Sequence, residues 1–217
     1  MERLSFSGNL FLFYIYSKKR MSLQEEIAAV IRNYNFKGWS PATSTNYSFK
    51  DEEHQIWVSR SGVDKNEFKA RDFIKVNSKG EAIGEYSQIK PSAETLIHCY
   101  LYEMFPGTKV ILHSHGINPV LISALVMSDV SFEGFEIQKG FDGQTTHLNK
   151  LRIPIFENSQ EMSFFEKELI YKRSQLTNHC FLIRKHGAYA WGTSLFEAKR
   201  HLETLDYLCE CKLKMIK

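Results

Sequence analysis

The sequence predicts a layered α/β or α+β domain in which helices flank a sheet of short strands. Two observations support this. Amphipathic segments with helix-start signals occur near both ends of the chain, and short β-type runs separated by turn residues lie between them. The chain has 217 residues, of which 43% are hydrophobic and 24% charged, which suits one soluble domain with a core. No repeat or Pro/Gly-rich linker divides it.

The two end helices have the same start signal. Ser22 and Glu25 form a capping-box pattern that opens a helix over about 22–34. The same spacing of Ser and Glu opens the last helix, over 194–215, whose leucines fall on one face. Between them we expect helices over 90–106 and 117–127, and strands near 55–59, 73–77, 109–115, 152–156 and 180–184.

Residues 1–20 differ from the rest of the chain. Their apolar run is too short to span a membrane, and the basic cluster follows it instead of preceding it as in a signal peptide. They also account for the net charge of +3, because the remaining chain has 24 basic and 24 acidic residues. We therefore expect an N-terminal extension outside the fold over 1–20 and a folded domain over 21–217, with no nucleic-acid or membrane partner.

The four cysteines, Cys99, Cys180, Cys209 and Cys211, do not resemble a disulfide framework in a chain of this size. A reducing, cytoplasmic location is the simpler expectation. Cys209 and Cys211 are two residues apart on a helix, where their side chains point in different directions. We expect them to be packing residues and not metal ligands.

The segment 111–116, ILHSHG, changes from an apolar strand into a pair of histidines. Side chains two residues apart on a strand point to the same face, so His113 and His115 project together. They could supply two of the three protein ligands that a catalytic zinc usually has. The third would come from the remaining histidines: His54, His98, His147, His179, His186 or His201.

Among these, His186 fits best, because it also ends an apolar strand and is followed by a glycine that permits a sharp turn. Strand ends are where side chains from separate elements converge on a cleft. His54 lies in a charged loop and His201 in the middle of a helix, which favours the surface for both. His98 falls outside the apolar stripe of its helix, so a surface or packing role is expected.

Six stretches carry a family resemblance: GWSPATSTNYS, SGVDK, KPSAETLIH, ILHSHG, FEIQKG and RKHGAYAWG. Their order, from about Ser22 to the C-terminus, resembles the class II aldolase/adducin family. This resemblance implies a three-layer α/β/α single domain with a central mixed, largely antiparallel sheet. It also implies a homotetramer with one Zn²⁺ per subunit, held by His113, His115 and His186.

The resemblance further implies a phosphate site and an acid/base group. Phosphate would be held by Asn46, Ser61, Gly62 and Ser92, although a Ser/Thr/Asn-rich loop can equally be a plain turn. Many relatives have glycine before the loop asparagine, where this chain has Thr45. Glu136 is the first candidate for the acid/base group and Glu94 the second, and either could be an ordinary surface or helix-start glutamate.

The implied activity is a zinc-dependent dehydration of a ketose phosphate with a methylthio tail, in methionine salvage. Two alternatives stay open. The same ligands would serve an aldolase or 4-epimerase acting on another sugar phosphate, because fold and ligands do not select the reaction. A non-catalytic interaction module with the same fold would not need all three histidines and both glutamates.

Overall fold

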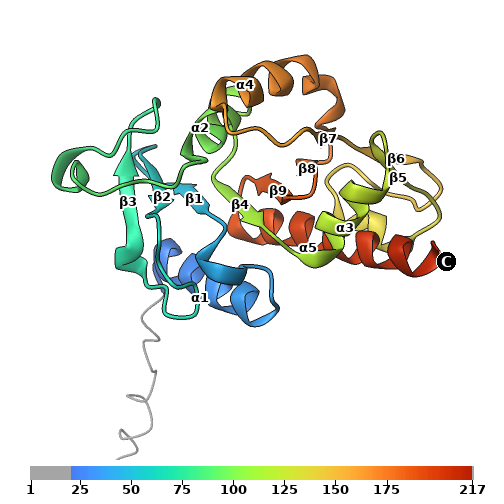
Figure 1. Ribbon diagram of the computed structural model, residues 1–217, viewed down its shortest axis with the longest axis horizontal. Helices are drawn as coiled ribbons and strands as arrows, with labels where there is room; N and C mark the ends of the chain where they lie inside the picture. Colours follow the sequence, from blue (N-terminus) through green and yellow to red (C-terminus); the bar gives the residue numbers. More distant parts are fainter. Residues whose placement is uncertain (1–20, 217) are drawn as a thin grey trace, which may run out of the picture.

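A computed structural model describes residues 21–216 (Figure 1). The expected extension, residues 1–20, lies outside them. The α-helices are α1 (Leu23–Phe36), α2 (Thr95–Met104), α3 (Ile117–Leu125), α4 (Met162–Tyr171) and α5 (Leu195–Met215). Short 3₁₀ turns are η1 (Pro41–Thr43), η2 (Ala70–Asp72), η3 (Gly84–Tyr86), η4 (Glu136–Gly140) and η5 (Arg173–Gln175).

Seven strands form the central sheet, in the order β3-β2-β1-β4-β9-β8-β7. Their bounds are β1 (Tyr47–Lys50), β2 (Ile56–Ser59), β3 (Phe73–Val76), β4 (Val110–Ser114), β7 (Ile155–Phe156), β8 (Cys180–Ile183) and β9 (Gly187–Gly192). Only β7 and β8 pair in parallel, and the other five pairs of neighbours are antiparallel. A separate ribbon pairs β5 (Val130–Phe132) with β6 (Leu151–Ile153). The expected mixed, largely antiparallel sheet is confirmed.

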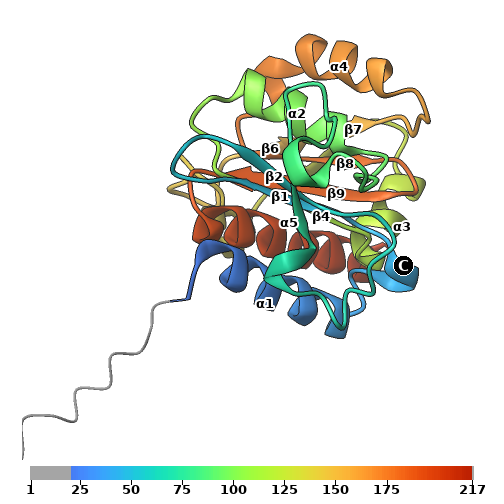
Figure 2. The same ribbon diagram turned by 90° about the vertical axis from the view of Figure 1, so that its left-hand side faces the viewer.

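Helices cover both faces of this sheet, which makes three layers (Figure 2). Alternate residues of β4 show why. Val110 and Leu112 join the apolar cluster that includes residues of α1, α3 and α5, whereas Ile111 joins the cluster that includes residues of α2 and α4. A strand with apolar side chains on both faces needs a cover on both. The three-layer α/β/α prediction is therefore confirmed.

Strand β9 alternates small and aromatic residues. Ala188 and Ala190 belong to the cluster on the α5 side, and Tyr189 and Trp191 to the other. The small residues let α5 approach closely: a Cβ placed on Gly192 would lie 2.6 Å from the Cβ of Glu197. Our sequence prediction missed β9, and also β1, β5 and α4, because these elements are short or lack a clear amphipathic period.

The two capping-box helices begin as predicted. Ser22 and Ser194 are their N-caps, and the Ser22 Oγ accepts a hydrogen bond from the Glu25 amide. Helix α2 begins later than predicted, at Thr95, and Ser92 does not cap it. The chain before it is instead held extended by a β-bridge between Arg60 and Pro91. In residues 21–216 no helix is long and apolar enough to cross a membrane.

Candidate metal centre and active site

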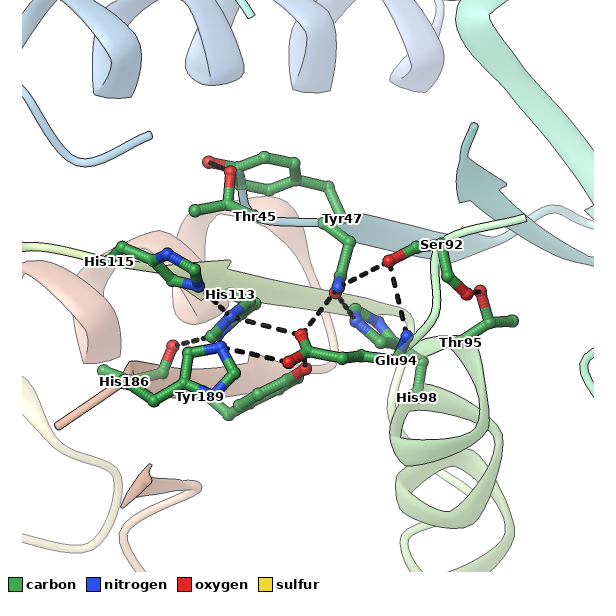
Figure 3. A network of polar contacts seen from close by, with 12 residues as sticks. Thr45, Tyr47, Ser92, Glu94, Thr95, His98, His113, His115, His186 and Tyr189 are labelled. Atoms are coloured by element: carbon green, nitrogen blue, oxygen red, sulfur yellow. Dashed lines mark hydrogen bonds and ion pairs between the residues drawn. The ribbon is translucent and has the colours of Figure 1, made fainter. Parts of the chain in front are cut away.

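Three histidines meet at one end of the sheet (Figure 3). His113 and His115 project from the end of β4, and their Nε2 atoms lie 2.8 Å apart. His186 lies in the turn between β8 and β9, and the pairing of Ser114 with Ala188 brings this turn beside the end of β4. The His186 ring is centred 5.2 Å from that of His113 and 4.6 Å from that of His115. The geometry thus gathers the three expected ligands.

Gly187 does not provide the left-handed residue of this turn, although we predicted that it permits the sharp turn. The left-handed residue of the turn is Lys185, with φ 55°, and not the glycine. A Cβ on Gly187 would instead lie 2.1 Å from the carbonyl oxygen of Ser114. The glycine is therefore required by the close approach of β9 to β4, which brings His186 to the other two histidines.

The histidine nitrogens suit a metal ion. His113 Nδ1 donates to the carbonyl oxygen of Ala188 at 3.0 Å, and His186 Nδ1 lies 3.1 Å from Asn158 Oδ1. These partners direct both Nε2 atoms into the cluster, as outer hydrogen bonds do around zinc. Burial lowers the pKa of His113 to about 4 and that of His115 to about 3, so both rings are neutral at pH 7. Neutral imidazoles are the form that binds metal, and the donor set fits zinc.

Glu94 lies against the same nitrogen atoms. Its Oε1 is 3.0 Å from His186 Nε2, and its Oε2 is 3.3 Å from His113 Nε2. Oε2 also accepts hydrogen bonds from the Tyr189 hydroxyl at 2.8 Å and the Asn46 amide at 2.9 Å. Burial raises the pKa of this carboxyl, but His113, His186 and Tyr189 outweigh it and hold the pKa well below the usual range. Glu94 is thus an ionised carboxylate at the centre of the cluster.

A chain of buried polar groups supports Glu94 from behind. Asn46 contacts His98 Nε2 through Oδ1, and His98 Nδ1 lies 2.7 Å from the Ser48 hydroxyl. His98 is only 1% exposed, and burial lowers its pKa to about 3. We had expected a surface or packing residue. His98 lies four residues after Glu94, and residues at that spacing face the same side of a helix. This spacing could have indicated that His98 lies beside Glu94, which the apolar periodicity of the helix does not show.

The four residues expected to bind phosphate lie on segments that contact one another. Asn46 Nδ2 donates to the Ser92 hydroxyl at 2.9 Å, and the Ser61 amide donates to the carbonyl oxygen of Lys90 at 3.2 Å. Gly62 has φ 75°, a left-handed conformation that favours glycine. The Asn46 loop and the Ser61–Gly62 turn are thereby both joined to the chain that leads into α2.

Lys65 is a further residue of this region that sequence reasoning did not single out. Its side chain is buried, and Nζ donates to the carbonyl oxygens of Thr43 and Val63 at 3.2 and 3.1 Å. Burial lowers its pKa to about 8. Lys65 therefore ties the loop before Asn46 to the segment that follows Gly62.

Thr45 occupies a glycine-like conformation, with φ 71°. Its hydroxyl lies 3.0 Å from that of Ser40 and 3.2 Å from that of Tyr47, contacts that help to hold a strained backbone. Ala42 and Thr43 are left-handed as well. Three of the four residues before Asn46 are thus strained, which indicates that a particular loop conformation is kept at a cost in local stability.

Glu136 lies elsewhere in the single chain. It is in η4, its side chain is 69% exposed, and its ion-pair partners are Lys139 and His147 Nδ1. The hydrogen bond from Lys139 lowers the pKa of Glu136. Within residues 21–216 the structure gives it no contact with the three histidines, so it does not join Glu94 there.

The other histidines had different outcomes. His54 is exposed, as expected. The surface placement expected for His201 is wrong: it is fully buried, and its Nδ1 donates to the carbonyl oxygen of Trp191 at 2.8 Å. The reason is that α5 is covered along much of its length, so a polar residue in mid-helix can still face the sheet. The four cysteines are free thiols, as expected.

Comparison with known proteins shows which proteins this chain is similar to. The chain is similar to methylthioribulose-1-phosphate dehydratase of Picosynechococcus sp., at 47% identity over 203 residues, which cover 93% of this chain and 96% of that protein. The protein of the same name from Enterobacter sp. is 38% identical over 181 residues, or 82% of this chain and 88% of its own.

Solved structures share the fold at lower identity. YgbL of Klebsiella pneumoniae superposes with a TM-score of 0.75 at 20% identity, covering 90% of each chain. The L-fuculose-1-phosphate aldolase of Thermus thermophilus has a TM-score of 0.66 at 19% identity, covering 89% of this chain and 93% of its own. The model of the class II aldolase and adducin N-terminal domain matches residues 25–213. The chain belongs to the class II aldolase and adducin family.

Proposed function

We propose that this protein is a lyase of methionine salvage. It removes water from 5-methylthioribulose 1-phosphate and yields 2,3-diketo-5-methylthiopentyl 1-phosphate. The observation that carries the proposal is the placement of the Glu94 carboxylate within 3.3 Å of the Nε2 atoms of two histidines, the buried His113 and the half-buried His186. That constellation lies in a chain 47% identical to a protein named for this reaction.

We propose zinc as the cofactor, one ion per subunit, held by His113, His115 and His186. All three ligand atoms lie within 4.8 Å of one another. A bound zinc ion supplies a Lewis acid for the negative charge that develops on substrate oxygens when a carbon-bound proton leaves. Three imidazoles also accept other divalent metals, so metal analysis is part of the test.

Dehydration requires two proton movements by the chain. A base removes the proton at C3 of the substrate, and an acid protonates the C4 hydroxyl as it leaves, because hydroxide is a poor leaving group. We assign removal of the C3 proton to the Glu94 carboxylate, which is ionised and adjacent to the ligand histidines. We assign protonation of the leaving C4 hydroxyl to Glu136, our first candidate from the sequence, which acts in the assembled protein.

The substrate phosphate is held by Asn46, Ser61, Gly62 and Ser92. Support comes from the contact of Asn46 with Ser92 and from the left-handed Gly62, whose turn can present backbone amides to an anion. Asn46 also donates a hydrogen bond to Glu94, so the same side chain would bind the phosphate and orient the proposed base.

We propose a homotetramer in the cytoplasm. The first support is an apolar stripe on α3, where Ile117, Leu121 and Leu125 are 62%, 45% and 59% exposed at intervals of four residues. Such a stripe on a surface helix is typical of an interface. The helix starts two residues after His115, so an interface there would place a second subunit near the metal ligands. We propose that this subunit supplies the Glu136 that completes the site. The four free thiols support a reducing compartment.

The first experiment is to incubate purified protein of known metal content with 5-methylthioribulose 1-phosphate and to identify the product by mass spectrometry. We expect loss of one water, abolished by a chelator and restored by zinc. The runner-up function, an aldolase or 4-epimerase, predicts two carbonyl fragments or an unchanged mass. His115→Ala should lose zinc and activity together, while His54→Ala, which alters an exposed histidine, should keep both.

The roles of Glu94 and Glu136 can be distinguished by running the reaction in D₂O. Glu136→Gln should still exchange the C3 proton but release no dione, since its assigned role follows proton removal. Glu94→Gln should lose exchange and dehydration alike. If Glu136→Gln dehydrates at the wild-type rate, Glu136 has no part in the reaction.

A further inference from the structure

A second cluster of metal-binding side chains lies away from the three histidines. One ligand atom from each of Asp142, His179 and His201 lies within 4.8 Å of the other two. The residues come from three segments: the chain after η4, the residue before β8, and α5. His201 contacts Trp191, at the far end of β9 from His186. Five residues of extended strand correspond to about 16 Å, so the two clusters are separate.

His201 is oriented as a ligand would be. The ring is fully buried, and Nδ1 donates to the carbonyl oxygen of Trp191 at 2.8 Å. Nε2 then carries the lone pair, and it is buried without a hydrogen-bond partner in the described part of the chain. His113 is held in the same way, through Nδ1 and the carbonyl oxygen of Ala188 on the same strand. A backbone acceptor on one ring nitrogen is the usual support for a metal on the other.

The remaining two side chains complete the spacing. Asp142 Oδ1 lies 3.6 Å from His201 Nε2, and Asp142 Oδ2 lies 3.7 Å from His179 Nδ1. These distances are too long for hydrogen bonds, and His179 Nδ1 is also buried without one within residues 21–216. Two ligand atoms that are each about 2.1 Å from one ion lie about 3.4 Å apart at the tetrahedral angle. The two observed separations, 3.6 and 3.7 Å to the two oxygens of Asp142, are slightly longer than that value, and the whole set of ligand atoms lies within 4.8 Å.

The charges around the cluster are compatible with a cation. Arg200 donates to Asp142 Oδ1, which orients the carboxylate and leaves Oδ2 directed at His179. Glu197 supplies a second negative charge, and it lines the same surface pocket as Asp142, His179 and the cationic Arg173. The pocket has a volume of about 320 Å³, which is room for several waters to complete the coordination.

We propose that Asp142, His179 and His201 form a second divalent-metal site, with zinc as the ion that two imidazoles and one carboxylate favour. The ion has a structural role. It joins the η4 region, the start of β8 and the buried face of α5. It thereby adds to the ion pair of Asp142 with Arg200 and to the hydrogen bond that Gln144 donates to Asn178 Oδ1. Binding at this site does not depend on the proposed reaction.

The test is a zinc count on the full chain, stripped with a chelator, equilibrated with Zn²⁺ and dialysed. Wild type should hold two zinc ions per chain. His115→Ala should hold one, His179→Gln one, and the double variant none. His179 and Asp142 are partly exposed, so His179→Gln and Asp142→Asn avoid the folding risk of altering His201. The matched control is His54→Gln, at an exposed histidine outside both clusters, which should keep two ions.

A second readout is stability. Zinc should raise the melting temperature of His115→Ala, in which only the second site is intact, and should leave that of the double variant unchanged. The proposal is overturned if His115→Ala retains no zinc, or if His179→Gln still holds two ions. If wild type holds only one zinc ion and His115→Ala loses that ion, the proposed second site is also overturned. If His179→Gln loses that ion instead, the second site is supported and the zinc ligands proposed for the reaction are contradicted.

Discussion

Tyr189 donates a 2.8 Å hydrogen bond to Glu94 Oε2, although 95 residues separate the two in the chain. The Tyr189 ring is buried and stacks on that of His113, with the centroids 4.1 Å apart. One side chain thus contacts both a proposed base and a proposed metal ligand. We infer that Tyr189 is a positioning residue that holds Glu94 beside the histidines.

Tyr189→Phe should therefore lower kcat and leave KM and zinc content nearly unchanged. Phenylalanine keeps the stacked ring and removes only the hydrogen bond to a charged carboxylate, which is worth about 1.5–3 kcal/mol, or roughly 10- to 150-fold in rate. Steady-state kinetics with zinc analysis measures this. Tyr171→Phe, at a tyrosine that is 78% exposed, is the control. Loss of zinc or an unchanged kcat would show that Tyr189 does not act through Glu94.

Gly187→Ala should disrupt the metal centre without touching a ligand. The new Cβ would lie 2.1 Å from the Ser114 carbonyl oxygen, so β4 and β9 must separate. We expect a loss of about 3 kcal/mol or more in the free energy of unfolding, together with weaker zinc binding. Gly107→Ala is the matched control, because its Cβ would meet only Thr193 Cγ2, at 4.0 Å. Denaturant unfolding of both variants decides; equal stability would contradict the prediction.

Lys65→Met should weaken substrate binding more than turnover. The substitution leaves the Thr43 and Val63 carbonyl oxygens without their donor and releases the loops that carry Asn46 and Gly62. An unsatisfied buried carbonyl costs about 1–3 kcal/mol, part of which will appear as a higher KM, on the order of tenfold. Zinc content should not change. A fall in kcat with KM unaltered would mean that Lys65 does not support the phosphate site.

Asp206→Asn should stabilise the protein at neutral pH. Burial raises the pKa of Asp206 to about 6 from its ordinary 3.8, and its Oδ1 has no hydrogen-bond partner in the part of the chain that the structure describes. The folded state therefore binds more protons than the unfolded state between pH 3.8 and 6, so wild-type stability falls as pH rises through that window.

The variant does not have this fall, so its advantage should be absent below about pH 4 and reach roughly 2–3 kcal/mol above pH 6. Urea unfolding of both proteins at pH 4 and pH 7 gives the two differences. An advantage that is the same at both pH values would show that the effect is one of packing and not of ionisation.

Local rules explain which parts of the site were predictable. The strand period places His113 and His115 on one face, and an apolar strand followed by His-Gly identifies His186. The Ser and Glu start signals locate α1 and α5 because each acts over three residues, and in both helices the serine side chain caps the amide of the glutamate. Each of these signals depends only on residues close together in the chain, so it can be read directly from the sequence.

By itself, the sequence determined the layered fold, the two long terminal helices, the family and the three proposed zinc ligands. Only the tertiary structure decided that Tyr189 and His98 support Glu94, that Glu136 lies away from the histidines in one chain, and that His201 is buried with Asp142 and His179. Those relationships join residues tens of positions apart. Their contacts depend on strand order and helix packing, which arise from burial of apolar surface over the whole domain and not from any local pattern.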